Sequence, residues 1–164
     1  MRDIVDGAFY SHVLDREPGQ FLTLTMSTDG VQPYNNSDKG IWPVTFVINE
    51  IERKRRFFFE NLIIGGVWPG PKKPKREEMF AFLDTIVQQL KELENGLDFE
   101  CRSSSGPIKR FLKVFLICSC MDKPAQAPVQ NLSEPTAKYG CGRSELRGED
   151  QALFLIDTHD DASV

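Results

Sequence analysis

One segment restricts the possible folds of this chain more than any other. Residues 111–121 (FLKVFLICSCM) form an apolar run that is almost unbroken. A strand with one solvated face alternates polar and apolar residues, whereas this run has no polar face. It therefore predicts a strand buried on both faces in the middle of a sheet, and a buried helix is the alternative. The run is also far shorter than the roughly 20 residues that a membrane-spanning helix needs.

Three segments that precede this run predict an antiparallel meander. Residues 21–27 (FLTLTMS) alternate strictly between apolar and polar side chains, as a half-buried strand does. Residues 41–48 predict a second strand, in which Pro43 indicates an edge position or a bulge because it cannot donate a hydrogen bond. Residues 57–67 predict a third strand interrupted by two glycines. The charged residues 52–56 between the last two segments have the length of a hairpin turn.

A helix is predicted next, after the proline-rich residues 69–74 have interrupted regular structure. Its apolar residues recur at helical spacing and predict about four turns that end at Asn95 and Gly96. We expect residues 99–107, which contain three serines and a Gly-Pro pair, to form a loop. The order of three strands, a crossover helix and a buried strand predicts an α/β fold with a mixed sheet, in which the last strand runs parallel to the first. The apolar helix positions are Met79, Phe82, Leu83, Ile86, Val87, Leu90 and Leu93.

Two aspartates follow the strands that are predicted to be parallel. Asp29 comes at the end of the first strand, and Asp122 follows the long apolar strand. Parallel neighbours would bring both carboxylates to one edge of the sheet, where their oxygens could hold Mg²⁺ or Mn²⁺ for phosphoryl transfer. Local chemistry offers an alternative for each: Asp29-Gly30 is a common turn dipeptide, and Asp122 before Pro124 suits a turn or a helix cap.

Four blocks of sequence follow one another along the chain. They are TDGV at 28–31 with Pro33, IWPV at 41–44 through INE at 48–50, GVW at 66–68 with PKKP at 71–74, and DKPA at 122–125. In this order they resemble the catalytic core of the CACTA-type (En/Spm-like) DNA transposases and their transposon-derived relatives. The resemblance continues into KYGC at residues 138–141 and covers the chain from about residue 20 to residue 148.

The resemblance implies an RNase H-like catalytic domain, truncated before its last catalytic helix, that cleaves DNA phosphodiester bonds and transfers strands with Mg²⁺ or Mn²⁺. Asp29 matches the first acid of the family's acidic triad, and Asp122 matches the second. Glu145, Glu149 and Asp157 do not match the third acid. We therefore expect this polypeptide alone not to cut or join DNA, because a missing ligand leaves the metal ions misplaced.

The family also carries a Cys-x-x-Cys pair after the second aspartate. Here Cys141 matches its first position, but Ser144 stands at the second. A single cysteine cannot make a tetrahedral zinc site, so we do not expect zinc to bind. We expect the four cysteines to stay as thiols in a reducing, intracellular location, which would be the nucleus for a functional transposase.

Positive charge is concentrated in one part of a chain whose net charge is −4. Between Arg53 and Arg76 there are eight Lys or Arg residues and a single acid, Glu60. The four cations just before the predicted helix are candidates for binding DNA phosphates, and a solubilising loop is the alternative. These four are Lys72, Lys73, Lys75 and Arg76.

The sequence thus predicts three parts: an N-terminal extension (1–20), a partial RNase H-like transposase core (21–130), and a remnant of the cysteine-containing insertion with an acidic tail (131–164). Two other functions stay open at this point. One is a non-catalytic module that binds DNA or a protein partner. The other is a fragment that has no independent function.

Overall fold

The computed structural model describes residues 3–31, 40–68, 70, 74–104 and 106–130. Within them lie five strands and four α-helices, together with two 3₁₀ turns, Ile4–Asp6 and Phe59–Asn61. The strands are β1 (Phe21–Thr28), β2 (Trp42–Ile48), β3 (Ile63–Trp68), β4 (Leu97–Ser103) and β5 (Gly106–Cys120). The helices are α1 (Ala8–Arg16), α2 (Arg53–Arg56), α3 (Arg76–Asn95) and α4 (Lys123–Val129).

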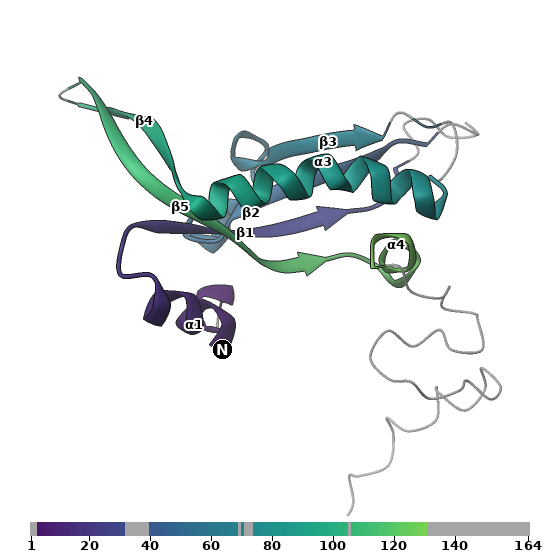
Figure 1. The fold of residues 1–164 in the computed structure, drawn as a ribbon, viewed down its shortest axis with the longest axis horizontal. Coiled ribbons are helices and arrows are strands. Elements are labelled where there is room, and N and C mark those ends of the chain that lie inside the picture. The colour runs from purple at the N-terminus through teal and green to yellow at the C-terminus, as the bar shows by residue number, and fades with distance from the viewer. Residues whose placement is uncertain (1–2, 32–39, 69, 71–73, 105, 131–164) are drawn as a thin grey trace, which may run out of the picture.

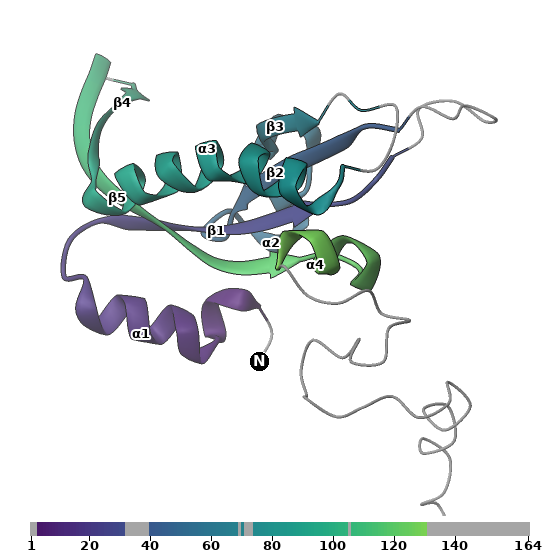
Figure 2. The same cartoon turned by 45° about the vertical axis from the view of Figure 1, so that its right-hand side comes forward.

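The strands form one mixed sheet in the order β3-β2-β1-β5-β4. β1 and β5 are parallel, and the other neighbouring pairs are antiparallel. The predicted meander, the crossover helix and the parallel pairing of the last strand with the first are therefore confirmed. The alternative of a buried helix for residues 111–121 is wrong. Helix α3 lies along one face of the sheet and α1 lies on the other side (Figures 1 and 2).

The core lies between α3 and the sheet. The alternation of apolar and polar residues in β1 supplies the apolar side chains on this face of the strand. Every second residue of that strand points toward α3, and Leu24 and Met26 on this face are 5% and 8% exposed. Burial of such side chains stabilises the fold by about 1.5–3 kcal/mol each. The buried members of this cluster are Leu24, Met26, Val44, Phe46, Ile86 and Val114.

Helix α3 begins one turn before the predicted apolar pattern and ends where it was predicted to end. Gly96 follows its last residue with a φ of +91°, a conformation that glycine adopts without strain. Not every predicted position faces the core, because Val87 is 41% exposed. No helix among the described residues is both long and apolar enough to cross a membrane.

The loop predicted for residues 99–107 is wrong, because most of this segment is a β-hairpin. Strand β4 pairs with β5 from Leu97 opposite Leu112 to Ser103 opposite Gly106. Residues 97–102 alternate apolar and polar side chains (LDFECR), so the strand signal was present. Ser103 and Gly106, two of the residues that suggested a loop, form the last pair of this hairpin.

The expected burial of β5 on both faces is also wrong. Val114 is 5% exposed, but Phe111 is 57% exposed. The first half of β5 pairs with β4 and the second half with β1, so the strand extends beyond the meander (Figure 1). Within the apolar run, Phe111 and Leu112 pair with β4, whereas residues 113–116 and 118–120 pair with β1.

The third strand begins at Ile63, six residues later than predicted. Residues 53–56 form the single turn of α2, and Phe59–Asn61 form a 3₁₀ turn before the strand starts. Gly65 is the extra residue of a bulge, because Val44 pairs with Gly66 and Thr45 pairs with Ile64. The chain therefore leaves β2 through a longer connection than a hairpin turn.

Pro43 occupies a position in β2 where a missing donor does little harm. The last β1 pair joins Thr28 to Val44, so Pro43 lies beyond it and pairs only with Val67 of β3. This agrees with the edge position that its proline predicts, although β2 as a whole is an inner strand.

Candidate functional site

Asp29 and Asp122 lie at the same edge of the sheet. The parallel register pairs Ser27 with Cys120, and each aspartate lies two residues beyond its member of this pair. Both side chains are exposed. The ends of β1 and β5 are therefore level with one another, as parallel pairing predicts.

A bulge in β5 produces this alignment. Leu24 pairs with Leu116, but Thr25 pairs with Cys118, so Ile117 is an extra residue. Without the bulge, Met121 would be opposite Asp29. A shift of one residue also exchanges the two faces of a strand, so the bulge places Asp122, and not Met121, level with Asp29 at this edge.

Each aspartate uses one oxygen to hold the local backbone. The backbone N–H of Gly30 donates to Asp29 Oδ1 at 2.7 Å. Asp122 is the N-cap of α4, and its Oδ1 accepts a hydrogen bond of 2.8 Å from the N–H of Ala125. The second oxygen of each carboxylate accepts no hydrogen bond from the described part of the chain, and these oxygens are candidate metal ligands.

A small cluster packs the elements around this edge. Trp42, Met79 and Ala125 are 8%, 0% and 0% exposed and bring together β2, α3 and α4. Gly30 lies against the Trp42 indole, because a Cβ at Gly30 would be 2.8 Å from the ring. The cluster therefore fixes the backbone that follows both strand ends.

The predicted phosphate-binding cations are only partly described. Lys75 and Arg76 are exposed at the start of α3, while Lys72 and Lys73 lie outside the described residues. The same turn of α3 contains Met79, which packs with Ala125 near the aspartates. The N-terminus of a helix favours anions, although Glu77 and Glu78 in this turn reduce the positive potential.

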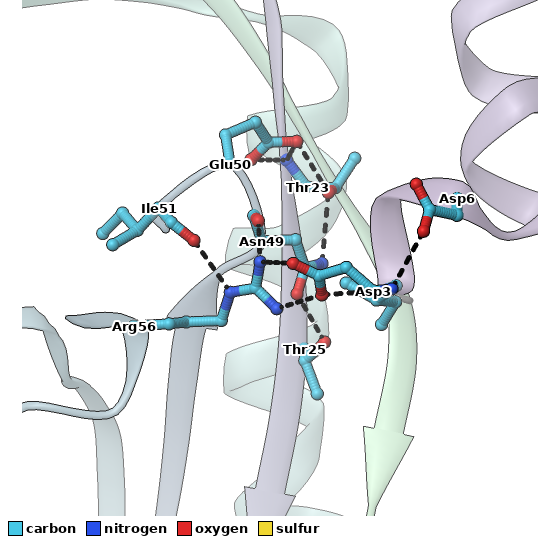
Figure 3. A network of polar contacts seen from close by, with 9 residues as sticks. Asp3, Asp6, Thr23, Thr25, Asn49, Glu50, Ile51 and Arg56 are labelled. Carbon is cyan, nitrogen blue, oxygen red and sulfur yellow. Dashed lines mark hydrogen bonds and ion pairs between the residues drawn. The ribbon is translucent and has the colours of Figure 1, made fainter. Parts of the chain in front are cut away.

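Arg56, another member of the basic stretch, faces inward. Its side chain donates two hydrogen bonds to the Asp3 carboxylate and others to the main-chain oxygens of Ile51 and Asn49 (Figure 3). Arg56 is 4% exposed, so a phosphate cannot reach it. These hydrogen bonds hold the pKa of Asp3 below its ordinary value, against the opposing effect of burial.

A second part of this polar network lies beside β1. Asn49 is 1% exposed, accepts a hydrogen bond from the Thr25 hydroxyl at 2.7 Å and donates to the Thr23 hydroxyl oxygen at 3.1 Å. The Glu50 carboxylate accepts from the backbone N–H and the hydroxyl of Thr23. The threonines of β1 thus bond to the end of β2 (Figure 3). Nothing local to Arg56 or Asn49 signals partners far away in the chain, so this network could not be predicted from the sequence.

Among the described residues, no group of three His, Cys, Asp or Glu side chains is arranged to hold a metal ion. Cys141, Glu145, Glu149 and Asp157 lie outside the described residues, as does the whole predicted remnant 131–164. A comparison with models of known protein families and with curated proteins finds no match to this chain.

Proposed function

We propose that this chain is a transposase-derived domain with an RNase H-like fold, in which Asp29 and Asp122 form part of a divalent-metal site that acts on DNA phosphodiester bonds. The observation that carries the proposal is the alignment of the two aspartates by the parallel register and the Ile117 bulge. The order of strands and the crossover by α3 support it, because the transposase resemblance implies such an arrangement. A functional protein of this kind would act in the nucleus.

The carboxylate donors fit a hard cation. Mg²⁺ and Mn²⁺ prefer oxygen ligands and keep several waters, so two carboxylates can hold one ion without a closed cage of protein ligands. A bound ion there would activate the attacking oxygen and neutralise charge on the phosphate. The role of the two aspartates is to position the ion, while Lys75 and Arg76 contact neighbouring phosphates.

The proposed site is a partial one. A family triad needs three acids, and this chain supplies matches to two of them, Asp29 and Asp122. We expect metal binding to be weak and the 164-residue polypeptide to be inactive in cleavage by itself, because transition-state stabilisation depends on the complete ligand set.

Mn²⁺ binding tests the proposal directly. Wild type, Asp29→Asn and Asp122→Asn are titrated with Mn²⁺ while the spectrum of free Mn²⁺ is followed by electron paramagnetic resonance. Each substitution removes charge and keeps the shape of the side chain, and asparagine also preserves the N-cap at position 122. Wild type should bind Mn²⁺, and both variants should lose most of that affinity.

The matched control is Asp98→Asn, which removes an exposed carboxylate from β4. It should bind Mn²⁺ like wild type. Equal Mn²⁺ binding by wild type, Asp29→Asn and Asp122→Asn would show that the pair is not a metal site. In a plasmid-nicking assay we expect no cleavage by wild type; nicking that disappears in Asp29→Asn would show that the site is complete after all.

A non-catalytic binding module is the second candidate, and the capping role of Asp122 is the observation that favours it. A hydrogen bond from Ala125 accounts for this carboxylate without any metal. Under this alternative, DNA affinity is independent of Mn²⁺ and unchanged in Asp29→Asn. The Mn²⁺ titration, repeated with DNA present, therefore separates the two functions.

A further inference from the structure

Two thiols lie side by side on the surface of β5 that faces away from α3. Cys118 and Cys120 are two residues apart on one strand, so their side chains share a face, and their sulfur atoms are 4.0 Å apart. The register places them opposite Thr25 and Ser27 of β1. The Ile117 bulge determines this placement, because it shifts the register just before Cys118.

Both cysteines line a cavity of about 640 Å³ between the N-terminal segment and the sheet. Ile4 and Phe9 contribute to its wall from the N-terminal segment, and Val47 contributes from β2. Cys118 is partly buried in this wall, whereas Cys120 is exposed. A small ion can therefore reach the sulfur pair from solvent, and apolar groups cover one side of it.

We propose that Cys118 and Cys120 form a binding site for a soft monovalent metal ion, of which Cu⁺ is the biological example. Metal–thiolate bonds of about 2.3 Å across the 4.0 Å separation give a sulfur–metal–sulfur angle of about 120°. The sulfur atoms need not move to hold the ion. An angle of this size leaves a third ligand position for a thiol or another small ligand.

The chemistry of the donors selects the ion. Thiolates prefer soft metals such as Cu⁺, whereas Mg²⁺ and Mn²⁺ prefer oxygen. Two sulfur donors at a trigonal angle suit Cu⁺, which accepts two or three ligands, better than Zn²⁺, which takes four. The thiol pair and the aspartate pair therefore take different ions, although Cys120 is only two residues from Asp122, and neither proposal depends on the other.

A competition titration tests the thiol site. Reduced full-length protein is added without oxygen to Cu⁺ held by a coloured chelator, and the loss of the chelator's absorbance measures transfer to the protein. Wild type should take one Cu⁺ per chain. Loss of a group that only supports a metal ligand weakens metal binding roughly 10- to 100-fold. Cys118→Ser and Cys120→Ser each remove a ligand itself, so each should weaken Cu⁺ binding by well over that amount.

Cys101→Ser and Cys141→Ser are the matched controls, and both should bind Cu⁺ like wild type. Wild-type affinity in Cys120→Ser, or loss of binding in Cys141→Ser, would overturn the proposal. Cys120 is exposed, so its serine variant keeps the test valid even if Cys118→Ser does not fold. Retained Mn²⁺ binding in Cys120→Ser would show that failure of one site leaves the other intact.

Discussion

Asp3 and Arg56 are 53 residues apart in the sequence and form a two-point ion pair, with Arg56 Nη1 2.7 Å from Asp3 Oδ1 and Nη2 2.8 Å from Oδ2. Only 5% of the Arg56 side chain and 23% of the Asp3 side chain are exposed. Because Arg56 also bonds to the main-chain oxygen of Asn49, this pair ties the N-terminal segment to the end of β2 (Figure 3).

The Asp3–Arg56 ion pair should contribute measurably to stability. Asp3→Asn should lower the free energy of unfolding by about 2–3 kcal/mol, because it leaves the guanidinium buried without a counter-charge. Urea denaturation measures the change. Asp15→Asn removes an exposed carboxylate from the neighbouring helix α1 and should stay within about 0.5 kcal/mol of wild type. Similar losses in the two variants would mean that the ion pair has no particular role.

The same pair predicts a pH dependence. The hydrogen bonds from Arg56 lower the pKa of folded Asp3 below its ordinary value of 3.8. A carboxyl group whose pKa is lower in the folded than in the unfolded protein stabilises the fold. This contribution is complete above the pKa of the unfolded state and is lost as the pH falls through the pKa of the folded state. The stability difference between wild type and Asp3→Asn should therefore be constant near neutral pH and shrink below about pH 4. A difference that persists to the lowest pH would exclude this carboxyl as its source.

Two glycines of positive φ predict unequal effects of alanine. Gly96 and Gly106 have φ values of +91° and +116°, but only at Gly96 would a Cβ overlap another group, the Phe111 ring. Gly106→Ala should cost about 1–3 kcal/mol from backbone strain alone. Gly96→Ala should cost more stability than Gly106→Ala. The difference between the two costs should become smaller when both substitutions are made in a Phe111→Leu background. Thermal unfolding measures the stability of these proteins. If the extra cost of Gly96→Ala is unchanged in the Phe111→Leu background, its cause is the backbone and not the Phe111 ring.

The N-cap of α4 predicts a contrast between two substitutions of one residue. Asp122→Ala removes the acceptor of the Ala125 N–H and should cost about 1 kcal/mol of stability, whereas Asp122→Asn should cost a few tenths at most. Urea denaturation provides the values. Asp84→Ala, at an exposed position within α3, is the control for losing an aspartate from a helix. Equal costs for alanine and asparagine would argue that charge, and not capping, is what Asp122 contributes.

Salt dependence tests the cations at the start of α3. If Lys75 and Arg76 bind DNA phosphates, alanine at both positions should weaken duplex binding and reduce the slope of log affinity against log salt by about 0.9 for each phosphate that is no longer bound. Fluorescence anisotropy at several salt concentrations gives the slope. Alanine at Lys109 and Arg110, two exposed cations of β5, is the control for the loss of positive charge. An equal change of slope in both double variants would indicate non-specific attraction.

Much of the fold could be predicted because its signals are local. The alternation of residues 21–27 predicts β1, and the helical spacing that ends at Gly96 predicts α3. The order of elements then predicts the parallel pairing of β1 with β5. The predicted edge for Asp29 and Asp122 follows from that pairing, whereas their binding of metal stays a prediction.

The errors arose where a local signal has more than one structural solution. Serines and a Gly-Pro pair suggested a loop over residues 99–107, yet β4 and β5 pair as a hairpin as far as Ser103 and Gly106. The charge pattern places Arg56 in a basic stretch, yet its side chain turns inward because Asp3 supplies its counter-charge. In both cases the deciding partner lies on another segment.

The sequence by itself determined which segments alternate, which segment is helical and in what order they follow, because these properties depend on the side chains of one segment. Only the tertiary structure decided the bulge at Ile117, and with it the alignment of Asp29 with Asp122 and the position of Cys118. It also decided that Asp3 meets Arg56. Register and long-range pairing depend on how whole elements pack against one another. The side-chain periodicity within one element does not determine that packing.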